Sequence, residues 1–266
     1  MQPLSPQQAL EKATETGCRK ANLTSEFSAR GIAKMTIAGA MAGAYIALGG
    51  LLALLVGQGF PEISAGNPGL AKLLSGAMFP VGLILVVFLG AELFTGNNAL
   101  LIPGWRERRI TAPKVLINWV VIYLTNFIGA ILFTAAIAWY SGATDAAIYR
   151  DAAINIATAK VNMPWLVVMV RGIGANWLVC LAIWLGITCP TPFARIVALW
   201  MPVMAFVVMG MEHSIANMFY LPLGMLHGAD ITIGCAICNN LIPATIGNII
   251  GGAIFVAMPF HILHRK

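Results

Sequence analysis

Residues 211–219 read Met-Glu-His-Ser-Ile-Ala-Asn-Met-Phe, and they place an acid, an imidazole, a hydroxyl and an amide inside an apolar run from Ile196 to Leu221. That run is about as long as a helix that spans a bilayer. Polar groups at mid-membrane depth are costly, so Glu212 and His213 are expected to line a pathway or cavity instead of facing lipid. A buried histidine satisfied by local hydrogen bonds is the alternative, and His213 alone does not decide between the two.

A second polar stretch has the same spacing 120 residues earlier in the chain. Residues 91–98 read Ala-Glu-Leu-Phe-Thr-Gly-Asn-Asn and also lie inside a long apolar run. Glu92 precedes Asn97 by five residues, as Glu212 precedes Asn217. Interrupted hydrophobic segments at matching places in the two halves of a chain indicate a transport site.

The composition is that of a polytopic membrane protein. Of the 266 residues 59% are apolar, the mean hydropathy is +0.83, and only 16 basic and 10 acidic side chains are present. So few polar groups cannot cover the surface of a soluble domain. The basic residues behind the net charge of +6 form no contiguous patch, which argues against nucleic acid as a partner.

The sequence carries no pattern for a cofactor, a metal or a catalytic centre. Its five cysteines are too scattered for a disulfide framework, and Cys235 and Cys238 have no second Cys or His pair at zinc-ligand spacing. Phosphate loops, nucleotide fingerprints and catalytic triads are missing as well. We therefore expect no cofactor, no bound metal and no enzymatic activity.

Six apolar segments have the length of membrane spans, and the second and fifth hold the two polar stretches. Residues 10–23 have the pattern of an amphipathic helix on the membrane surface, with a flexible tail as the alternative. We predict an all-α polytopic membrane protein with a cytoplasmic N-terminal segment (1–31), a channel domain (32–263) and a short cytoplasmic tail (264–266). The predicted spans are 32–56, 70–101, 115–140, 164–187, 196–221 and 241–263.

The distribution of lysine and arginine sets the expected orientation. Twelve of the 16 basic residues lie in segments on the N-terminal side of the membrane, whereas Lys72, Arg150 and Lys160 lie on the opposite side. The positive-inside rule then places both termini in the cytoplasm. The expected location is the cytoplasmic (inner) membrane.

The two halves of the chain match beyond their acidic positions. Four residues of the third span recur with identical internal spacings in the sixth: Asn118, Asn126, Gly129 and Phe133 against Asn240, Asn248, Gly251 and Phe255. Copies offset by three spans insert with opposite orientation, which predicts an inverted 3+3 repeat over residues 32–140 and 164–263. The asparagines are expected mainly to hold helices together.

The sequence Thr95-Gly-Asn-Asn98 does not favour a continuous helix, because glycine is permissive and threonine and asparagine compete for backbone hydrogen bonds. Non-helical backbone at membrane depth is tolerated only where it is buried in protein or lines a watery cavity. We therefore expect helices two and five to be broken and to line a pore.

Four motifs together resemble the formate/nitrite transporter family. They are Glu92–Asn97, Asn176–Trp184, Glu212–Phe219 and Asn240–Gly252, in the family's order, and the similarity covers residues 32–260. The resemblance implies an aquaporin-like bundle of six spans, assembled as a homopentamer with one pore in each protomer. It also implies that His213 is the central pore histidine and that it faces Thr95.

The same resemblance assigns roles to the residues around that histidine. Glu212, Asn217 and Asn97 are pore residues, and Lys160 and Asn176 match an outer-vestibule lysine and a pore asparagine. The expected hydrophobic constriction consists of Phe79, Leu83, Phe206 and Phe94. Core packing is the alternative for these apolar side chains. The segment 222–239 is shorter than in many members of the family, so we expect the outer vestibule, where Lys160 lies, to differ.

An isolated anion in an apolar constriction would face a cost of the order of tens of kcal/mol. In the mechanism that the resemblance suggests, Lys160 concentrates the anion and His213 donates a proton, so that the neutral acid passes the constriction. A permanently neutral histidine that only polarises the pore is the alternative.

The sequence therefore predicts proton-coupled transport of a small monovalent weak-acid anion, with formate first and nitrite or hydrosulfide as alternatives. The expected partners are this anion, protons, the lipid bilayer and further copies of the chain. An aquaporin-type channel for neutral solutes would need the paired Asn-Pro-Ala motifs that are missing here. A membrane-embedded enzyme would need a second catalytic group near His213 besides Glu212.

Overall fold

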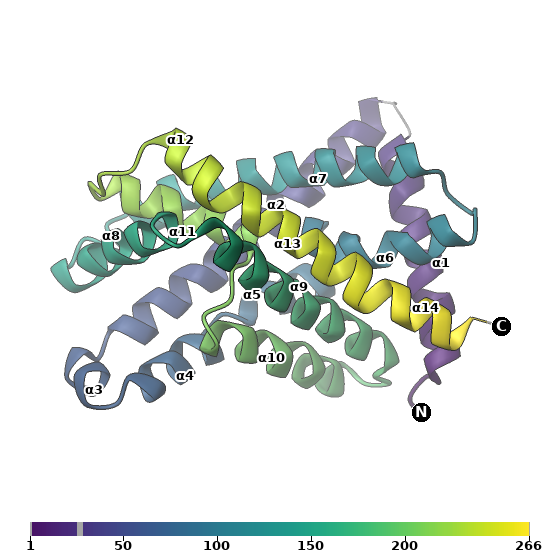
Figure 1. The fold of residues 1–266 in the computed structure, drawn as a ribbon, viewed down its shortest axis with the longest axis horizontal. Helices are drawn as coiled ribbons and strands as arrows, with labels where there is room; N and C mark the ends of the chain where they lie inside the picture. The colour runs from purple at the N-terminus through teal and green to yellow at the C-terminus, as the bar shows by residue number, and fades with distance from the viewer. Residues whose placement is uncertain (1, 26–28, 266) are drawn as a thin grey trace.

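The computed structural model describes residues 2–25 and 29–265, and the regular elements in these ranges are all helical. Figure 1 shows a bundle in which α1 and both chain ends lie at one end, and α3, α8 and α12 lie at the other. The all-α class predicted from the sequence is confirmed.

The first half of the bundle contains α1 (Pro6–Ser25), α2 (Ala29–Gln58), α3 (Pro61–Gly66), α4 (Pro68–Met78), α5 (Val81–Phe88), α6 (Phe94–Arg106) and α7 (Ala112–Phe133), which a π-helical segment extends over Thr134–Tyr140. The second half contains α8 (Ala147–Val161), α9 (Trp165–Thr188), α10 (Pro192–Val208), α11 (Ser214–Leu226), α12 (Ile233–Cys235), α13 (Ile242–Gly252) and α14 (Met258–His264), with π-helical segments at Ala236–Leu241 and Ala253–Ala257.

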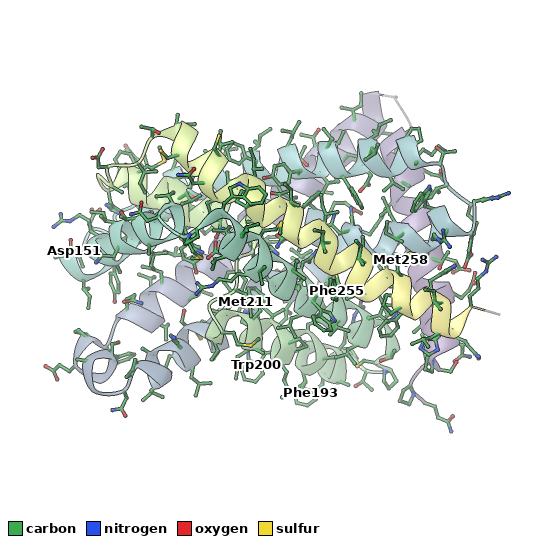
Figure 2. The ribbon with its side chains drawn as sticks, in the orientation of Figure 1. Asp151, Phe193, Trp200, Met211, Phe255 and Met258 are labelled. Carbon is green, nitrogen blue, oxygen red and sulfur yellow. The ribbon has the colours of Figure 1, made fainter. Side chains whose placement is uncertain are left out.

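Several helical runs are apolar enough to cross a membrane, as predicted. Within the described ranges, five are also long enough: Arg30–Gln58, Pro68–Phe88, Ala112–Tyr140, Trp165–Thr188 and Ile233–His264. The last begins at Ile233, eight residues before the predicted start at 241. The apolar helices α10 and α11 are shorter. Large apolar side chains such as Phe193 and Trp200 project outward from α10 (Figure 2).

The two polar stretches fall where helices end. Residues 89–93 separate α5 from α6, and residues 209–213 separate α10 from α11. In each gap the second residue is a glycine with positive φ, Gly90 at 71° and Gly210 at 67°. A side chain at these positions would meet the steric penalty of the left-handed region, so glycine allows both sharp turns.

The N-terminal helix α1 packs across α6 and α7 at the end of the bundle where the chain termini lie (Figure 1). Ala9, Leu10 and Ala13 form its buried stripe. The segment is therefore a helix, whereas its position on the membrane surface stays a prediction.

Candidate functional site

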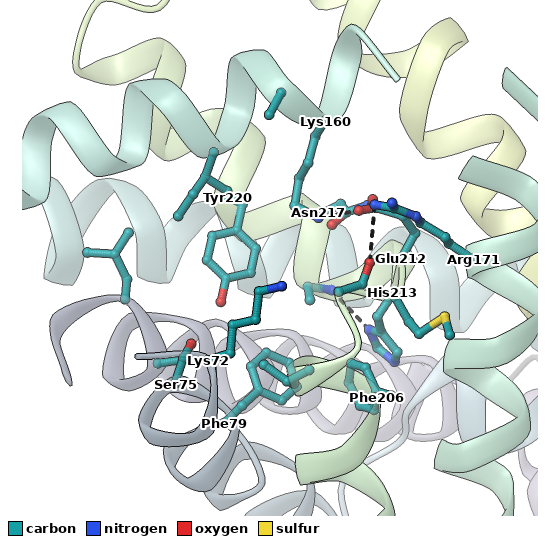
Figure 3. Close-up of a pocket in the computed structure, with 18 of the residues that line it drawn as sticks. Lys72, Ser75, Phe79, Lys160, Arg171, Phe206, Glu212, His213, Asn217 and Tyr220 are labelled. Carbon is teal, nitrogen blue, oxygen red and sulfur yellow. Dashed lines mark hydrogen bonds and ion pairs between the residues drawn. The ribbon is translucent and has the colours of Figure 1, made fainter. Parts of the chain in front are cut away.

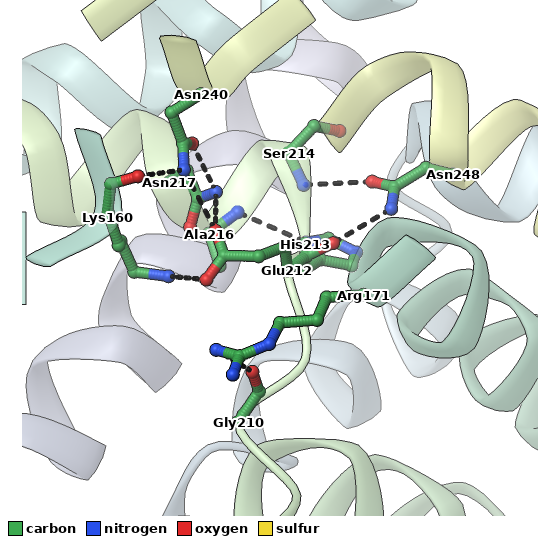
Figure 4. A network of polar contacts seen from close by, with 10 residues as sticks. All are labelled: Lys160, Arg171, Gly210, Glu212, His213, Ser214, Ala216, Asn217, Asn240 and Asn248. Atoms are coloured by element: carbon green, nitrogen blue, oxygen red, sulfur yellow. Dashed lines mark hydrogen bonds and ion pairs between the residues drawn. The ribbon is translucent and has the colours of Figure 1, made fainter. Parts of the chain in front are cut away.

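His213 and Thr95 bring the two interruptions into direct contact. The Nε2 atom of His213 lies 3.0 Å from Oγ1 of Thr95, and its Nδ1 atom accepts a hydrogen bond from the backbone N–H of Ala216 at 3.1 Å (Figure 4). A neutral imidazole carries a single N–H. The hydrogen-bond pattern therefore assigns the proton to Nε2, which donates to Thr95, and assigns a neutral ring to His213.

An aromatic pair covers one side of this histidine. The ring of Phe206 stacks on the His213 ring at 5.8 Å between centroids, and Phe79 meets Phe206 edge-on at 5.5 Å. Both phenylalanines are 3% exposed. They therefore form an apolar wall beside His213 (Figure 3).

A cavity of about 480 Å³ is bordered by His213 and by both phenylalanines. Its wall combines the apolar pair with His213 and a set of polar and charged side chains (Figure 3): Lys72, Ser75, Lys160, Arg171, Glu212, Asn217 and Tyr220. We call it the outer cavity, because the orientation predicted from the sequence puts Lys160 outside.

Glu212 is held by an ion pair and two amides. Its Oε1 accepts from Nζ of Lys160 at 2.7 Å, and its Oε2 accepts from the Nδ2 atoms of Asn217 at 2.7 Å and Asn240 at 3.0 Å (Figure 4). Glu212 is 2% exposed. Such a buried carboxylate is tolerated because a cation and hydrogen bonds compensate it.

The other half of the chain repeats this network around Glu92. Nζ of Lys20 lies 2.6 Å from Oε2 of Glu92, and Nδ2 of Asn97 donates to that same oxygen at 3.1 Å and to Oδ1 of Asn118 at 3.0 Å. Sequence reasoning did not assign a role to Lys20. A buried carboxylate such as Glu92 needs a cation nearby, but the sequence around Glu92 did not reveal that this cation would come from α1.

A second cavity, of about 280 Å³, borders the Lys20–Glu92 pair and shares no lining residue with the outer cavity. Its basic side chains are Lys12, Arg19, Lys20 and Arg195. We call it the inner cavity. His213 lines the outer cavity, Thr95 lines neither cavity, and Gly96, the neighbour of Thr95 in the chain, lines the inner one.

Two asparagines replace the helical hydrogen bonds that the interruptions remove. Nδ2 of Asn126 donates to the carbonyl oxygens of Gly39 and Glu92, both at 2.8 Å, and its Oδ1 accepts from the N–H of Phe94 at 2.9 Å. Asn248 makes the same three kinds of bond at the other interruption, at 2.8 to 2.9 Å, with Gly172, Glu212 and Ser214. The asparagine side chains thus take the place of water as hydrogen-bond partners for backbone N–H and C=O groups that lack a helical partner.

A family model described as formate/nitrite transporter matches residues 7–262. The chain belongs to the formate/nitrite transporter family. The resemblance noted from the sequence is thereby confirmed. Since this is a family of transporters and channels, the protein is an integral membrane protein and not an enzyme.

Individual members of the formate/nitrite transporter family match over nearly the whole chain. A probable formate transporter of Methanothermobacter thermautotrophicus is 41% identical over 88% of this chain and 90% of its own length. The formate channel BtFdhC of Bacillus thuringiensis is 37% identical, over 98% of this chain and 96% of its own.

Two solved structures resemble the fold. An FNT family ion channel has a TM-score of 0.85 at 30% identity, over 96% of this chain and 98% of its own. A pentameric formate channel with formate bound has a TM-score of 0.77 at 30% identity, over 90% and 100% of the two chains.

Four residues that the family resemblance singled out line neither cavity: Thr95, Asn176, Leu83 and Phe94. Asn176 donates through Nδ2 to the carbonyl oxygens of Thr95 at 3.2 Å and Asn248 at 2.6 Å, so it fixes backbone behind the polar contact. Leu83 is buried within the core around α5. Phe94 packs edge-on against Tyr123 at 4.9 Å. Of the four expected constriction residues, Phe79 and Phe206 thus face the outer cavity.

Proposed function

We propose that this family member transports small monovalent weak-acid anions, formate first, along a path from the outer cavity past His213 and Thr95 to the inner cavity. The observation that carries the proposal is the contact between His213 and Thr95, since it joins both helix interruptions between two basic cavities. Relatives described as formate channels support formate as the substrate.

The proposal includes six spans arranged as an inverted repeat, with spans two and five interrupted halfway across the membrane. Two matching polar networks support this arrangement. In each network a lysine and an asparagine bind the glutamate, and that asparagine also donates to a second asparagine. The members are Lys20, Glu92, Asn97 and Asn118 in the first half and Lys160, Glu212, Asn217 and Asn240 in the second. We also propose a homopentamer with one pore per protomer, because a solved relative is described as a pentameric formate channel. Its location would be the cytoplasmic membrane, with both termini inside.

The permeating species in this proposal is the neutral acid. An anion that leaves a watery, basic cavity for the wall formed by Phe79 and Phe206 loses solvation, which favours its protonation. Proton coupling at His213 was the expectation from the sequence. Because Nδ1 of His213 already accepts from Ala216, the geometry supports the second role considered for it, a neutral donor that hydrogen-bonds the passing acid through Nε2.

Nitrite and hydrosulfide remain the alternative substrates, because both are small monovalent anions of weak acids. Uptake into proteoliposomes at two pH values separates the substrates and tests the function. We expect formate uptake to be faster at the lower pH, where more acid forms at the constriction. Chloride or glycerol uptake as fast as that of formate would overturn the weak-acid mechanism.

A further inference from the structure

The outer cavity contains three cations, but only one of them has a carboxylate partner. Lys160 is paired with Glu212 at 2.7 Å, and their side chains are 14% and 3% exposed. Glu212 is the one acidic residue in the wall of this cavity. Among the described residues, Lys72 and Arg171 lie within ion-pair distance of no carboxylate.

The Lys160–Glu212 pair has little net charge to offer an incoming anion. Its two charges cancel at any distance that is large compared with their separation. Moving Lys160 toward the substrate would also leave Glu212 buried without a cation, at a cost that a weakly bound anion cannot offset. The attraction for an anion therefore has to come from the two unpaired cations.

Lys72 and Arg171 lie on opposite walls of the cavity. Lys72 belongs to α4, on the same helix face as Ser75 and Phe79, and its ammonium is directed into the cavity (Figure 3). Arg171 belongs to α9, and its Nη1 donates to the carbonyl oxygen of Gly210 at 3.4 Å (Figure 4). This single long bond leaves most of the five guanidinium N–H donors available to a ligand.

The position of Arg171 has no cationic counterpart in the other half. The backbone N–H of Glu212 donates to the carbonyl of Arg171, and the equivalent N–H of Glu92 donates to the carbonyl of Ala38. The networks around the two glutamates are thus repeated, whereas the cation at 171 is an addition on the outer side alone.

We propose that Lys72 and Arg171 form an anion-collecting site in the outer cavity, separate from the Lys160–Glu212 pair, for small carboxylates and other oxyanions. This inference rests on the proposed function, since it names where the transported anion first binds. Two unpaired cations also suit a divalent oxyanion such as sulfate, which fits the cavity but keeps its charge and is stopped at Phe79 and Phe206.

The local potential can be measured without any transport. A reporter cysteine at Ala159, an exposed residue of the cavity wall, is introduced by Ala159→Cys after Cys235 and Cys238 are replaced by serine. The rates at which this cysteine reacts with an anionic and with a cationic thiosulfonate are measured by mass spectrometry of the peptide that contains it. Lys72→Gln and Arg171→Gln should each lower the ratio of anionic to cationic rate about two- to fivefold, as expected for one unit charge several ångströms away.

Arg150→Gln is the matched control, because Arg150 lies on α8 outside the cavity wall and its loss removes the same charge. It should leave the ratio unchanged. An unchanged ratio in Lys72→Gln, Arg171→Gln and their combination would overturn the proposed site. An equal fall in Arg150→Gln would do the same, because the effect would then belong to the net charge of the protein.

A transport measurement on the same proteins separates this inference from the proposed function. The Lys72→Gln/Arg171→Gln protein should need a severalfold higher external formate concentration for half-maximal uptake, and several times more external sulfate for half-maximal inhibition, at constant ionic strength. If the unsubstituted protein moves no formate, the proposed function fails, and the reporter ratio still decides on the site. The proposed site would be overturned if the double variant had the same formate concentration for half-maximal uptake and the same sulfate concentration for half-maximal inhibition as the unsubstituted protein.

Discussion

Nε2 of His213 lies 3.0 Å from Oγ1 of Thr95, although the two residues are 118 positions apart in the chain. The bond joins the start of α11 to the first turn of α6. Both ring nitrogens of His213 are engaged, Nε2 with Thr95 and Nδ1 with Ala216. To become an imidazolium, the ring would have to give up the N–H of Ala216.

Replacement of His213 by asparagine tests which role the ring has. Asparagine is a favoured residue before the first turn of a helix, so it can accept from Ala216 while its amide group donates to Thr95. We expect His213→Asn to assemble normally, to transport formate more slowly and to keep the pH dependence of uptake. The measurement is uptake into proteoliposomes about one pH unit below and above the ordinary histidine pKa of about 6.5. A correctly assembled variant with a flat pH profile would instead identify His213 as the proton donor.

Replacement of Thr95 tests the hydroxyl alone. Thr95→Ala removes the acceptor of the His213 proton, whereas Thr95→Ser keeps the hydroxyl and loses the methyl group. We expect roughly tenfold lower formate uptake for Thr95→Ala, the order of one buried hydrogen bond of about 1.4 kcal/mol, and close to normal uptake for Thr95→Ser. The pH dependence should survive in both. Equal losses in the two variants would mean that packing at Thr95, and not its hydroxyl, matters.

Local sequence patterns predicted the parts of the site whose members are close in the chain. The five-residue spacings of Glu92 with Asn97 and of Glu212 with Asn217 correspond to direct hydrogen bonds. The motifs also pointed to His213 opposite Thr95. The two Glu–Asn hydrogen bonds follow from the rule that buried polar groups need partners, whereas the placement of His213 opposite Thr95 came from the resemblance to the family.

The remaining contacts depend on tertiary packing, which a single sequence does not reveal. Lys20 reaches Glu92 from a helix 72 positions away, and the sequence predicted it only as a basic residue of the amphipathic helix and of the cytoplasmic charge excess. Lys72 likewise entered the sequence analysis only through the topology, and Arg171 had no predicted role. Phe94 has the composition of a constriction residue, but its ring turns toward Tyr123 because α7 packs beside it.

The Lys20–Glu92 pair should stabilise the fold in the way expected of a buried ion pair. Lys20→Gln would leave Glu92 uncompensated, and the cost should be about 3 kcal/mol of unfolding free energy. Lys20→Gln/Glu92→Gln removes both charges and should recover most of that loss. Unfolding by sodium dodecyl sulfate, followed by circular dichroism, measures both variants. If the double variant were no more stable than Lys20→Gln, the ion pair would not be the cause.

The orientation can be tested with native and introduced cysteines. Cys235 and Cys238 are exposed and follow α11, on the side that the charge bias places outside. An impermeant thiol reagent applied to intact cells should label them. In a Cys235→Ser/Cys238→Ser background it should label Ala146→Cys but not Ala112→Cys. Labelling at residue 112 and not at residue 146 would reverse the assigned orientation.

His227, at the end of α11, gives the protein a pH-dependent contact away from the proposed path. Oγ1 of Thr144 donates to the carbonyl of Ala138 at 2.8 Å, so it accepts from Nε2 of His227 at 2.7 Å. Burial lowers the pKa of His227, Asp145 opposes this shift and Arg150 adds to it.

A lowered pKa means that the unfolded chain binds the proton more readily than the folded protein. The stabilisation that neutral His227 contributes is therefore fully present above the pKa of about 6.5 that histidine has in the unfolded chain. It is lost as the pH falls through the lower pKa of His227 in the folded protein. We expect the thermal unfolding midpoint in detergent to fall on acidification below about pH 6.5. His227→Gln keeps a donor for Thr144 without a titratable ring, so its midpoint should fall less. His264→Gln, at the end of α14, is the control with the same change of residue type and should follow the unsubstituted protein. Parallel curves for His227→Gln and His264→Gln would rule out a contribution of His227 to acid sensitivity.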